Sequence, residues 1–315
     1  MNGSPEEIKW TLHKENPLIA PPWPSPIIAD PSLLLPETSP DGKWHLIAHS
    51  ILGLHSFTSE DGIHWSRPSF LFANAMRPYL YQEGETYYLF YERYRSFQLP
   101  FSWVPFPKWK SRIEVRTSKD LKHWSKPHTV LLPHLSWHES KYGKSISNPC
   151  LIKVEKIYRL YYSASLQRIE DCGFCEPRYI GYAQSEQITG PYTSATEPMI
   201  TPEVSDPHCN LAAGAMKVVE HNGQYLGFQN GIYVDERSVS GSAILLLKSA
   251  DGITWSRPTE PILKPTSGWM RSHVYALDVK RRSKTWYLYF NARDDWHWTR
   301  GKEKIGLLLG EEAVP

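Results

Sequence analysis

Polar side chains that could bind or transform a substrate recur at matching places in five similar segments of the chain. Each segment has an apolar strand, a polar turn and a second strand rich in Tyr, Phe or Leu. The first strands begin at Asp30, Arg77, Asn148, Gly214 and His273. The second strands end at His49, Glu92 with Arg93, Ser163, Asn230, and the run Asn291, Arg293 and Asp294. Because the strands behind these positions are apolar, the polar set predicts a site at the strand ends.

Glu92 follows an apolar run, YYLFY, and two interpretations of it stay open. A carboxyl group there would be partly desolvated, which raises its pKa toward the range that a general acid needs. An ion pair with Arg77, Arg93 or Arg95 would lower that pKa instead.

Other charged residues also have two interpretations. Asp206 lies in the loop Ser-Asp-Pro-His before the fourth segment, from which it could reach the site, although a turn residue before proline is the favoured interpretation. Arg77 and Arg271 could each hold a carboxylate or phosphate group through paired hydrogen bonds. Alternatively, they pair with Asp30 or Glu92 without a ligand.

A repeated turn sequence indicates the hairpins that position these residues. It reads SEDGIHWSRP from Ser59, SKDLKHWSKP from Ser118 and SADGITWSRP from Ser249. The Asp can accept backbone N–H bonds across a hairpin turn, Gly suits a positive φ, and the Trp can pack back on the strand.

The five segments start roughly 50 to 70 residues apart, within reach of the spacing of four-stranded propeller blades. We therefore predict an all-β fold, a single five-bladed β-propeller over residues 1–315 with four-stranded antiparallel blades. The blades start near residues 29, 77, 148, 213 and 272, and the segment 8–20 closes the ring. A β-sandwich with similar hairpins is the weaker alternative.

Composition excludes several classes of protein. The 315 residues are 41% hydrophobic and 22% charged, with a net charge of +2, so neither nucleic acid nor a membrane is expected as a partner. No run of 18 apolar residues and no secretory signal is visible, so we expect a cytoplasmic protein. The sequence does not indicate an oligomeric state. The 26 prolines argue against long helices.

Two further features could carry function. Cys172, Cys175, His208 and Cys209 are a possible set of zinc ligands, but a single CxxC with an adjacent His-Cys favours ordinary loop thiols. The insertion Phe97–Lys110 holds five aromatic residues and three prolines, and we expect it to contact a sugar or a partner, although it could instead pack on its own blade.

These repeats, the S-x-D-G-x-x-W turns and the Ala-Asp-Pro-Ser opening of the first blade resemble the five-bladed propeller glycosidases, above all glycoside hydrolase family 43 with its relatives in families 32, 68 and 130. The resemblance implies a blade-one Asp as general base, a blade-three Asp and a blade-four Glu as general acid. Asp30 matches the first position. Asn148 and Gly214-Ala215 stand at the other two, so the chain is a divergent member. The resemblance also implies that a channel histidine, here His273, contacts a central ion or water.

We accordingly expect a glycosidase-like enzyme that acts on a glycosidic bond of an oligosaccharide or glycoconjugate. Asp30 and Glu92 are the predicted catalytic pair, because such cleavage usually needs two carboxyl groups. The predicted substrate-binding residues are Arg77, Arg93, Asn148, Asp206, Asn230, Arg271 and His273. We expect no cofactor, while a channel-bound calcium or other ion stays open. The alternative is a carbohydrate-binding or scaffolding propeller without catalysis.

Overall fold

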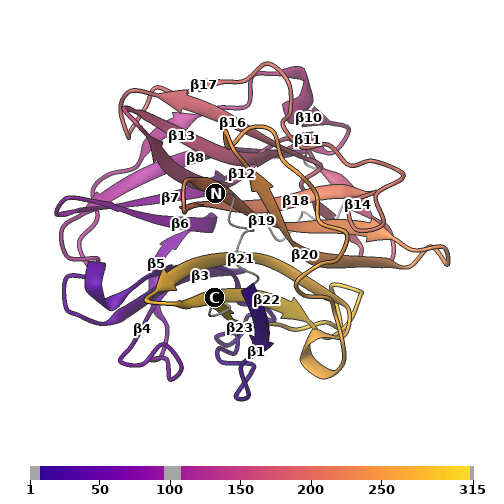
Figure 1. The fold of residues 1–315 in the computed structure, drawn as a ribbon, viewed down its shortest axis with the longest axis horizontal. Helices are drawn as coiled ribbons and strands as arrows, with labels where there is room; N and C mark the ends of the chain where they lie inside the picture. The colour runs from indigo at the N-terminus through magenta and orange to yellow at the C-terminus, as the bar shows by residue number, and fades with distance from the viewer. Residues whose placement is uncertain (1–7, 96–107, 313–315) are drawn as a thin grey trace, which may run out of the picture.

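The computed structural model describes residues 8–95 and 108–312 as five mainly antiparallel β-sheets arranged around a common axis, with a separate two-stranded hairpin (Figure 1). This arrangement confirms the predicted five-bladed propeller. The described helices are short 3-10 turns: η1 (Pro36–Thr38), η3 (Ser136–His138) and η4 (Gly268–Met270). None of the helices in the described ranges could span a bilayer.

The first three blades follow one another along the chain. Blade one contains β2 (Ala29–Leu34), β3 (Trp44–Ser50), β4 (Gly53–Ser59) and β5 (Ser69–Ala73). Blade two contains β6 (Ala75–Glu83), β7 (Thr86–Tyr94), β8 (Trp109–Ser118) and β9 (His128–Leu131), and β10 (Glu139–Ser140) and β11 (Gly143–Lys144) extend its sheet. Blade three contains β12 (Ile146–Val154), β13 (Ile157–Ala164), β16 (Tyr179–Ser185) and β17 (Thr193–Ser194), with the hairpin β14 (Gln167–Ile169) and β15 (Phe174–Glu176) inserted between β13 and β16.

The last two blades depart from a simple repeat. Blade four contains β18 (Ala212–His221), β19 (Gln224–Val234) and β20 (Ser240–Ser249), and isolated bridges from β20 to Leu263 and Ser256 replace a fourth strand. Blade five contains β21 (His273–Arg282), β22 (Thr285–Arg293) and β23 (Glu303–Glu312). Its outermost strand is β1 (Ile8–Leu12), which pairs with β23 from the other end of the chain (Figure 1).

The repeated turns form as their residues predict. In the first turn, Oδ1 of Asp61 accepts hydrogen bonds from the backbone N–H groups of Ile63 and His64, each at 2.8 Å. Asp120 and Asp251 make the same pair of bonds in the other turns. Trp255 lies against Gly227 of its own blade, as predicted, and all three turn tryptophans also pack against the preceding blade. Trp65, for example, meets Tyr289 edge to face at 5.7 Å.

The residue after the Asp of each turn depends on that neighbouring blade. A Cβ atom on Gly62 would lie 3.0 Å from the hydroxyl of Tyr289, and one on Gly252 would lie 2.7 Å from that of Tyr161. In the middle turn the equivalent position is Leu121, which has a φ of 60° and packs against Ile47 and its neighbours in the core. Ile47 occupies the strand position of the two tyrosines and leaves room for a side chain.

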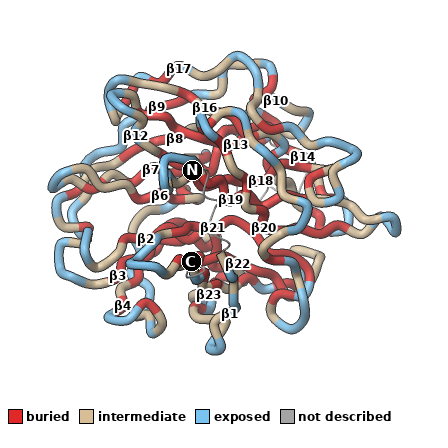
Figure 2. Tube along the Cα trace, viewed as in Figure 1, coloured by how far each residue is buried: buried red, intermediate tan, exposed pale blue. Residues whose placement is uncertain are grey.

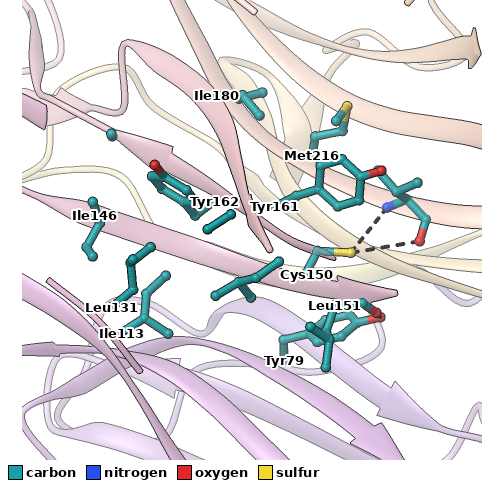
Figure 3. Close-up of a cluster of buried hydrophobic side chains, with 14 of the residues drawn as sticks. Tyr79, Ile113, Leu131, Ile146, Cys150, Leu151, Tyr161, Tyr162, Ile180 and Met216 are labelled. Carbon is teal, nitrogen blue, oxygen red and sulfur yellow. Dashed lines mark hydrogen bonds between the residues drawn. The ribbon is translucent and has the colours of Figure 1, made fainter. Parts of the chain in front are cut away.

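The hydrophobic core lies between neighbouring blades, as it must when amphipathic sheets stack in a ring. Figure 2 shows buried residues along the strands and exposed ones along the outer turns. In the largest cluster, which joins blades two, three and four, Leu131, Leu160 and Val218 are each at most 4% exposed. Within it the Cys150 thiol accepts a hydrogen bond from the backbone N–H of Val218 at 3.2 Å, which ties blade three to blade four (Figure 3).

Candidate active site

Each first strand is bulged near its start, and the bulges turn side chains toward the axis. The pairing register shifts at this place in all five blades, for example between Ala29 and Ser32. Asp30, Arg77 and Asn148 lie in the bulges with φ values of 52°, 53° and 49°, and Gly214 has a φ of 67°. Left-handed backbone at residues other than glycine costs of the order of 1 kcal/mol each and is typical of functional sites.

These bulges surround one end of a cavity of about 560 Å³. All five first strands contribute to its lining, and we call one lining residue from each strand the mouth ring: Asp30, Arg77, Asn148, Ala215 and Ala276. The apolar walls include Ile27, Ile51, Met76, Trp109, Leu166, Phe174 and Trp298, and the remaining polar groups include Asn230, Asn291, Glu176 and Glu303. A cavity with apolar walls and a few converging polar groups is the usual form of a small-molecule site.

Asp30 is held as a carboxylate. Burial opposes its ionisation, but His49, Arg77 and Lys217 together lower the pKa of Asp30 below its usual range. Nδ1 of His49 lies 3.2 Å from Oδ2 of Asp30, although the angle is poor for a hydrogen bond. The side-chain oxygen of Asn291 accepts the backbone N–H of Asp30 at 3.0 Å and fixes the bulge.

Glu176 is the carboxyl group that the sequence analysis missed. It ends β15 in the hairpin inserted into blade three and lines the cavity. Burial raises the pKa of Glu176 to about 8; Asp30 and Glu303 add to the rise, whereas Arg77 and Arg293 oppose it. Glu176 is therefore mainly protonated at neutral pH in the same cavity in which Asp30 is ionised. Two carboxyl groups whose environments separate their pKa values are the signature of an acid and base pair.

The backbone shows how a hairpin brings a carboxyl group to this part of the cavity. A Cβ atom on Gly214 would lie 2.0 Å from the carbonyl oxygen of Asn230, so no side chain fits there without a shift. The N–H of Gly214 instead donates to the carbonyl of Pro177 at 3.0 Å, and Ala213 donates to Arg178 at the same distance. Glu176 immediately precedes Pro177, so the hairpin brings a carboxyl group to the blade-four position that lacks one.

Glu92 is placed behind the cavity, in the ion-pair arrangement that the sequence left open. It is fully buried, its Oε2 lies 2.6 Å from Nη1 of Arg77, and its Oε1 accepts a hydrogen bond from Nε1 of Trp109 at 3.0 Å. Arg77 and Trp109 line the cavity, whereas Glu92 does not. In this geometry Glu92 fixes two residues of the cavity wall.

The structure brings some of the predicted binding residues together and not others. Arg77, Asn148 and Asn230 line the cavity. Arg93 donates to the carbonyl of Ala73, Asp206 pairs with Arg257, and Arg271 pairs with Asp295, all away from the cavity lining. The turn interpretation of Asp206 fits its bond from the N–H of His208.

His273 lies behind the cavity wall. It is 1% exposed and stacks on the ring of Tyr275, which lines the cavity, with 5.2 Å between ring centroids. Burial lowers the pKa of His273 to about 3, which keeps the ring neutral. Its Nε2 lies 3.2 Å from Oγ of Ser240 and 3.8 Å from Sγ of Cys172.

The candidate zinc ligands have other surroundings. All four cysteines are free thiols, with Cys172 against Ser240 and Cys209 near Gln229. Among the described residues, no three His, Cys, Asp or Glu side chains are grouped so that they could hold a metal ion. Of the aromatic insertion Phe97–Lys110, residues 97–107 lie outside the described ranges, and Trp109 at its end lines the cavity.

Comparison with known proteins gives a match to one family model. Residues 71–210 match the family model for Glycosyl hydrolases family 43. No curated protein matches the chain in sequence. The matched range runs from β5, the outer strand of blade one, to the loop before blade four, and it contains Arg77, Asn148 and Glu176.

Solved structures share the fold over nearly the whole chain. An α-L-arabinofuranosidase from Podospora anserina has 13% identity, covers 98% of each chain and gives a TM-score of 0.65. A glycosyl hydrolase from Bacteroides ovatus has 15% identity, with coverage of 96% of this chain and 94% of the other and a TM-score of 0.64. An N-acetylgalactosamine deacetylase from F. plautii has 12% identity, with coverage of 98% and 95% and a TM-score of 0.64. The chain is therefore glycoside-hydrolase-like in family match and in fold.

Proposed function

We propose that this protein cleaves a glycosidic bond of an oligosaccharide or glycoconjugate in the cavity at the propeller axis. Asp30 serves as the general base or nucleophile, and Glu176 takes the place of Glu92 as the general acid. The observation that carries the proposal is the opposite protonation of the two carboxyl groups, since the pKa of Asp30 is lowered while that of Glu176 is raised to about 8.

The proposed reaction uses each group in its resting state. Protonated Glu176 donates its proton to the oxygen of the leaving sugar as the glycosidic C–O bond breaks. Ionised Asp30 either accepts a proton from the attacking water or attacks the anomeric carbon itself. Arg77, oriented by its 2.6 Å ion pair with Glu92, presents a fixed positive charge that acts on both acids.

The competing function is carbohydrate binding without turnover. It is favoured by Asn148, which cannot ionise, and by Gly214, which has no space for a side chain. Asn148 and Arg77 of the mouth ring, together with Asn230, would then bind a sugar while the two carboxyl groups served only as hydrogen-bonding groups. The deacetylase among the structural neighbours shows that proteins of this fold differ in activity.

A panel of aryl glycosides and natural oligosaccharides, assayed with wild type and Asp30→Asn, separates the two functions. We expect turnover of at least one substrate and a loss of about 10²- to 10⁴-fold in Asp30→Asn, the usual contribution of acid–base catalysis. A matched control is Asp206→Asn, which changes an aspartate away from the cavity and should keep full activity. Sugar binding by wild type without any product would favour the competing function.

A further inference from the structure

A second ring of residues lies one step further along the same five strands, two residues after each member of the mouth ring. We call it the axial ring: Ser32, Tyr79, Cys150, Lys217 and Asp278. Each of these residues is paired in its blade with an apolar or aromatic residue of the second strand, for example Lys217 with Phe228 and Tyr79 with Phe90. All five are buried, none more than 5% exposed.

Lys217 is the unusual member of this ring. Its side chain is 5% exposed, and burying an ammonium group costs several kcal/mol unless other charges compensate for it. Nζ donates a hydrogen bond to the carbonyl of Pro149 at 2.7 Å and lies 4.8 Å from the centre of the Tyr79 ring. No carboxylate of the described residues lies within 4.0 Å of Nζ. The positive charge of Lys217 is therefore not neutralised by a direct ion pair.

The acidic residue of the axial ring, Asp278, already has hydrogen-bond and ion-pair partners of its own. Asp278 accepts hydrogen bonds from Oγ of Ser32 at 3.0 Å and from the backbone N–H of Leu33 at 2.9 Å, and Lys280 lies 3.6 Å from its other oxygen. Asp30, two residues before Ser32, has no such set of donors. Burial lowers the pKa of Lys217, and the charges of Asp278 and Asp30 oppose this fall. The charge of Lys217 in turn helps to lower the pKa of Asp30.

We propose that Lys217 is a positioning residue for the reaction: its ammonium group, fixed on the propeller axis beneath the mouth ring, is the built-in counter-charge that keeps Asp30 ionised when a sugar fills the cavity. The inference rests on the proposed function. Sugar in the cavity removes water from Asp30 and strengthens the charges that remain. Three other titratable residues face Asp30: His49, Arg77 and Glu176. Arg77 also pairs with Glu92, and Glu176 disfavours a negative charge on Asp30.

The ionisation of Asp30 can be followed without any turnover. The experiment is a carboxyl titration of the whole protein by NMR with ¹³C-labelled aspartate, in wild type, Lys217→Met and Lys217→Arg, with Asp30→Asn to assign the signal. We expect Lys217→Met to move the Asp30 midpoint up by about one pH unit, which corresponds to a tenfold change in the ionisation equilibrium. Lys217→Arg should restore most of the wild-type value, because it restores the charge.

Lys280→Met is the matched control. Lys280 also faces the Tyr79 ring, at 5.2 Å, but its charge is paired with Asp278 and is not among the largest influences on Asp30. This variant should leave the Asp30 midpoint unchanged. If Lys217→Met folds, as judged by its near-UV spectrum, and the midpoint stays where it is, the proposal is wrong. If Lys217→Met does not fold, Lys217→Gln is used in its place with the same expectation.

Kinetics then separate this proposal from the proposed function. If the protein turns over a glycoside, Lys217→Met should lose about tenfold in kcat/KM on the acidic side of the profile and much less near neutral pH. An equal loss at every pH would mean that Lys217 only holds Pro149, and would overturn the proposal. If no glycoside is turned over, the proposed function fails, while the NMR titration still decides whether Lys217 controls Asp30.

Discussion

The mouth ring and the axial ring occupy the same five strands two residues apart, but their polar groups have different environments. In the axial ring the polar atoms are largely satisfied: Ser32 donates to Asp278 at 3.0 Å and accepts the N–H of Leu80 at 2.8 Å, and the Tyr79 hydroxyl donates to the carbonyl of Leu151. In and around the mouth ring, left-handed backbone and a protonated carboxyl group persist. The comparison indicates that the axial ring stabilises the propeller, whereas the mouth ring gives up stability for chemistry.

Substitution in the axial ring at positions other than Lys217 should therefore reduce stability and leave the chemistry intact. Ser32→Ala removes the donor to Asp278 and the acceptor of the Leu80 N–H, both buried, and should lower the free energy of unfolding by about 1–3 kcal/mol. Denaturant unfolding monitored by tryptophan fluorescence measures the change. A loss of activity without a loss of stability would contradict the division of roles between the two rings.

Substitution of Glu176 in the cavity should instead increase stability and reduce activity. The folded state raises the pKa of Glu176 from 4.5 to about 8, so its stabilising contribution is complete below about pH 4.5 and is lost as the pH rises through 8. Glu176→Gln cannot ionise and should be more stable than wild type at pH 9, by about 1 kcal/mol or more, and similar at pH 4. Thermal unfolding of both proteins across this range tests it. A constant difference at all pH values would show that Glu176 ionises normally.

Much of this architecture could be predicted from the sequence, because it depends on local and repeated chemistry. The S-x-D-G-x-x-W turns predict their own hydrogen bonds, and the strand starts predict Asp30, Arg77 and Asn148 at the cavity. Glu176 was missed because it lies outside the repeat, in a hairpin between two strands of blade three. The unusual length of that connection, from Ala164 to Tyr179, was the available signal.

Glu92 shows a second limit of sequence reasoning. Its position at the end of an apolar strand fits both a desolvated acid and the partner of an arginine, and only the placement of Arg77 and Trp109 distinguishes the two. Whether an acid is catalytic depends on which side chains of the neighbouring strands it contacts. That information comes from side chains 15 and 17 residues away in blade two.

The pH dependence of kcat/KM on the best substrate of the panel, for wild type and Glu176→Gln, tests the central claim most directly. Asp30 must be ionised and Glu176 protonated, so wild-type activity should fall on the acidic side only below the usual titration range of an aspartate, and on the alkaline side with a midpoint at about pH 8. Glu176→Gln should lose about 10²- to 10⁴-fold in rate together with the alkaline limb. An alkaline limb at pH 8 that survives in an active Glu176→Gln protein would contradict the assignment of Glu176 as the acid.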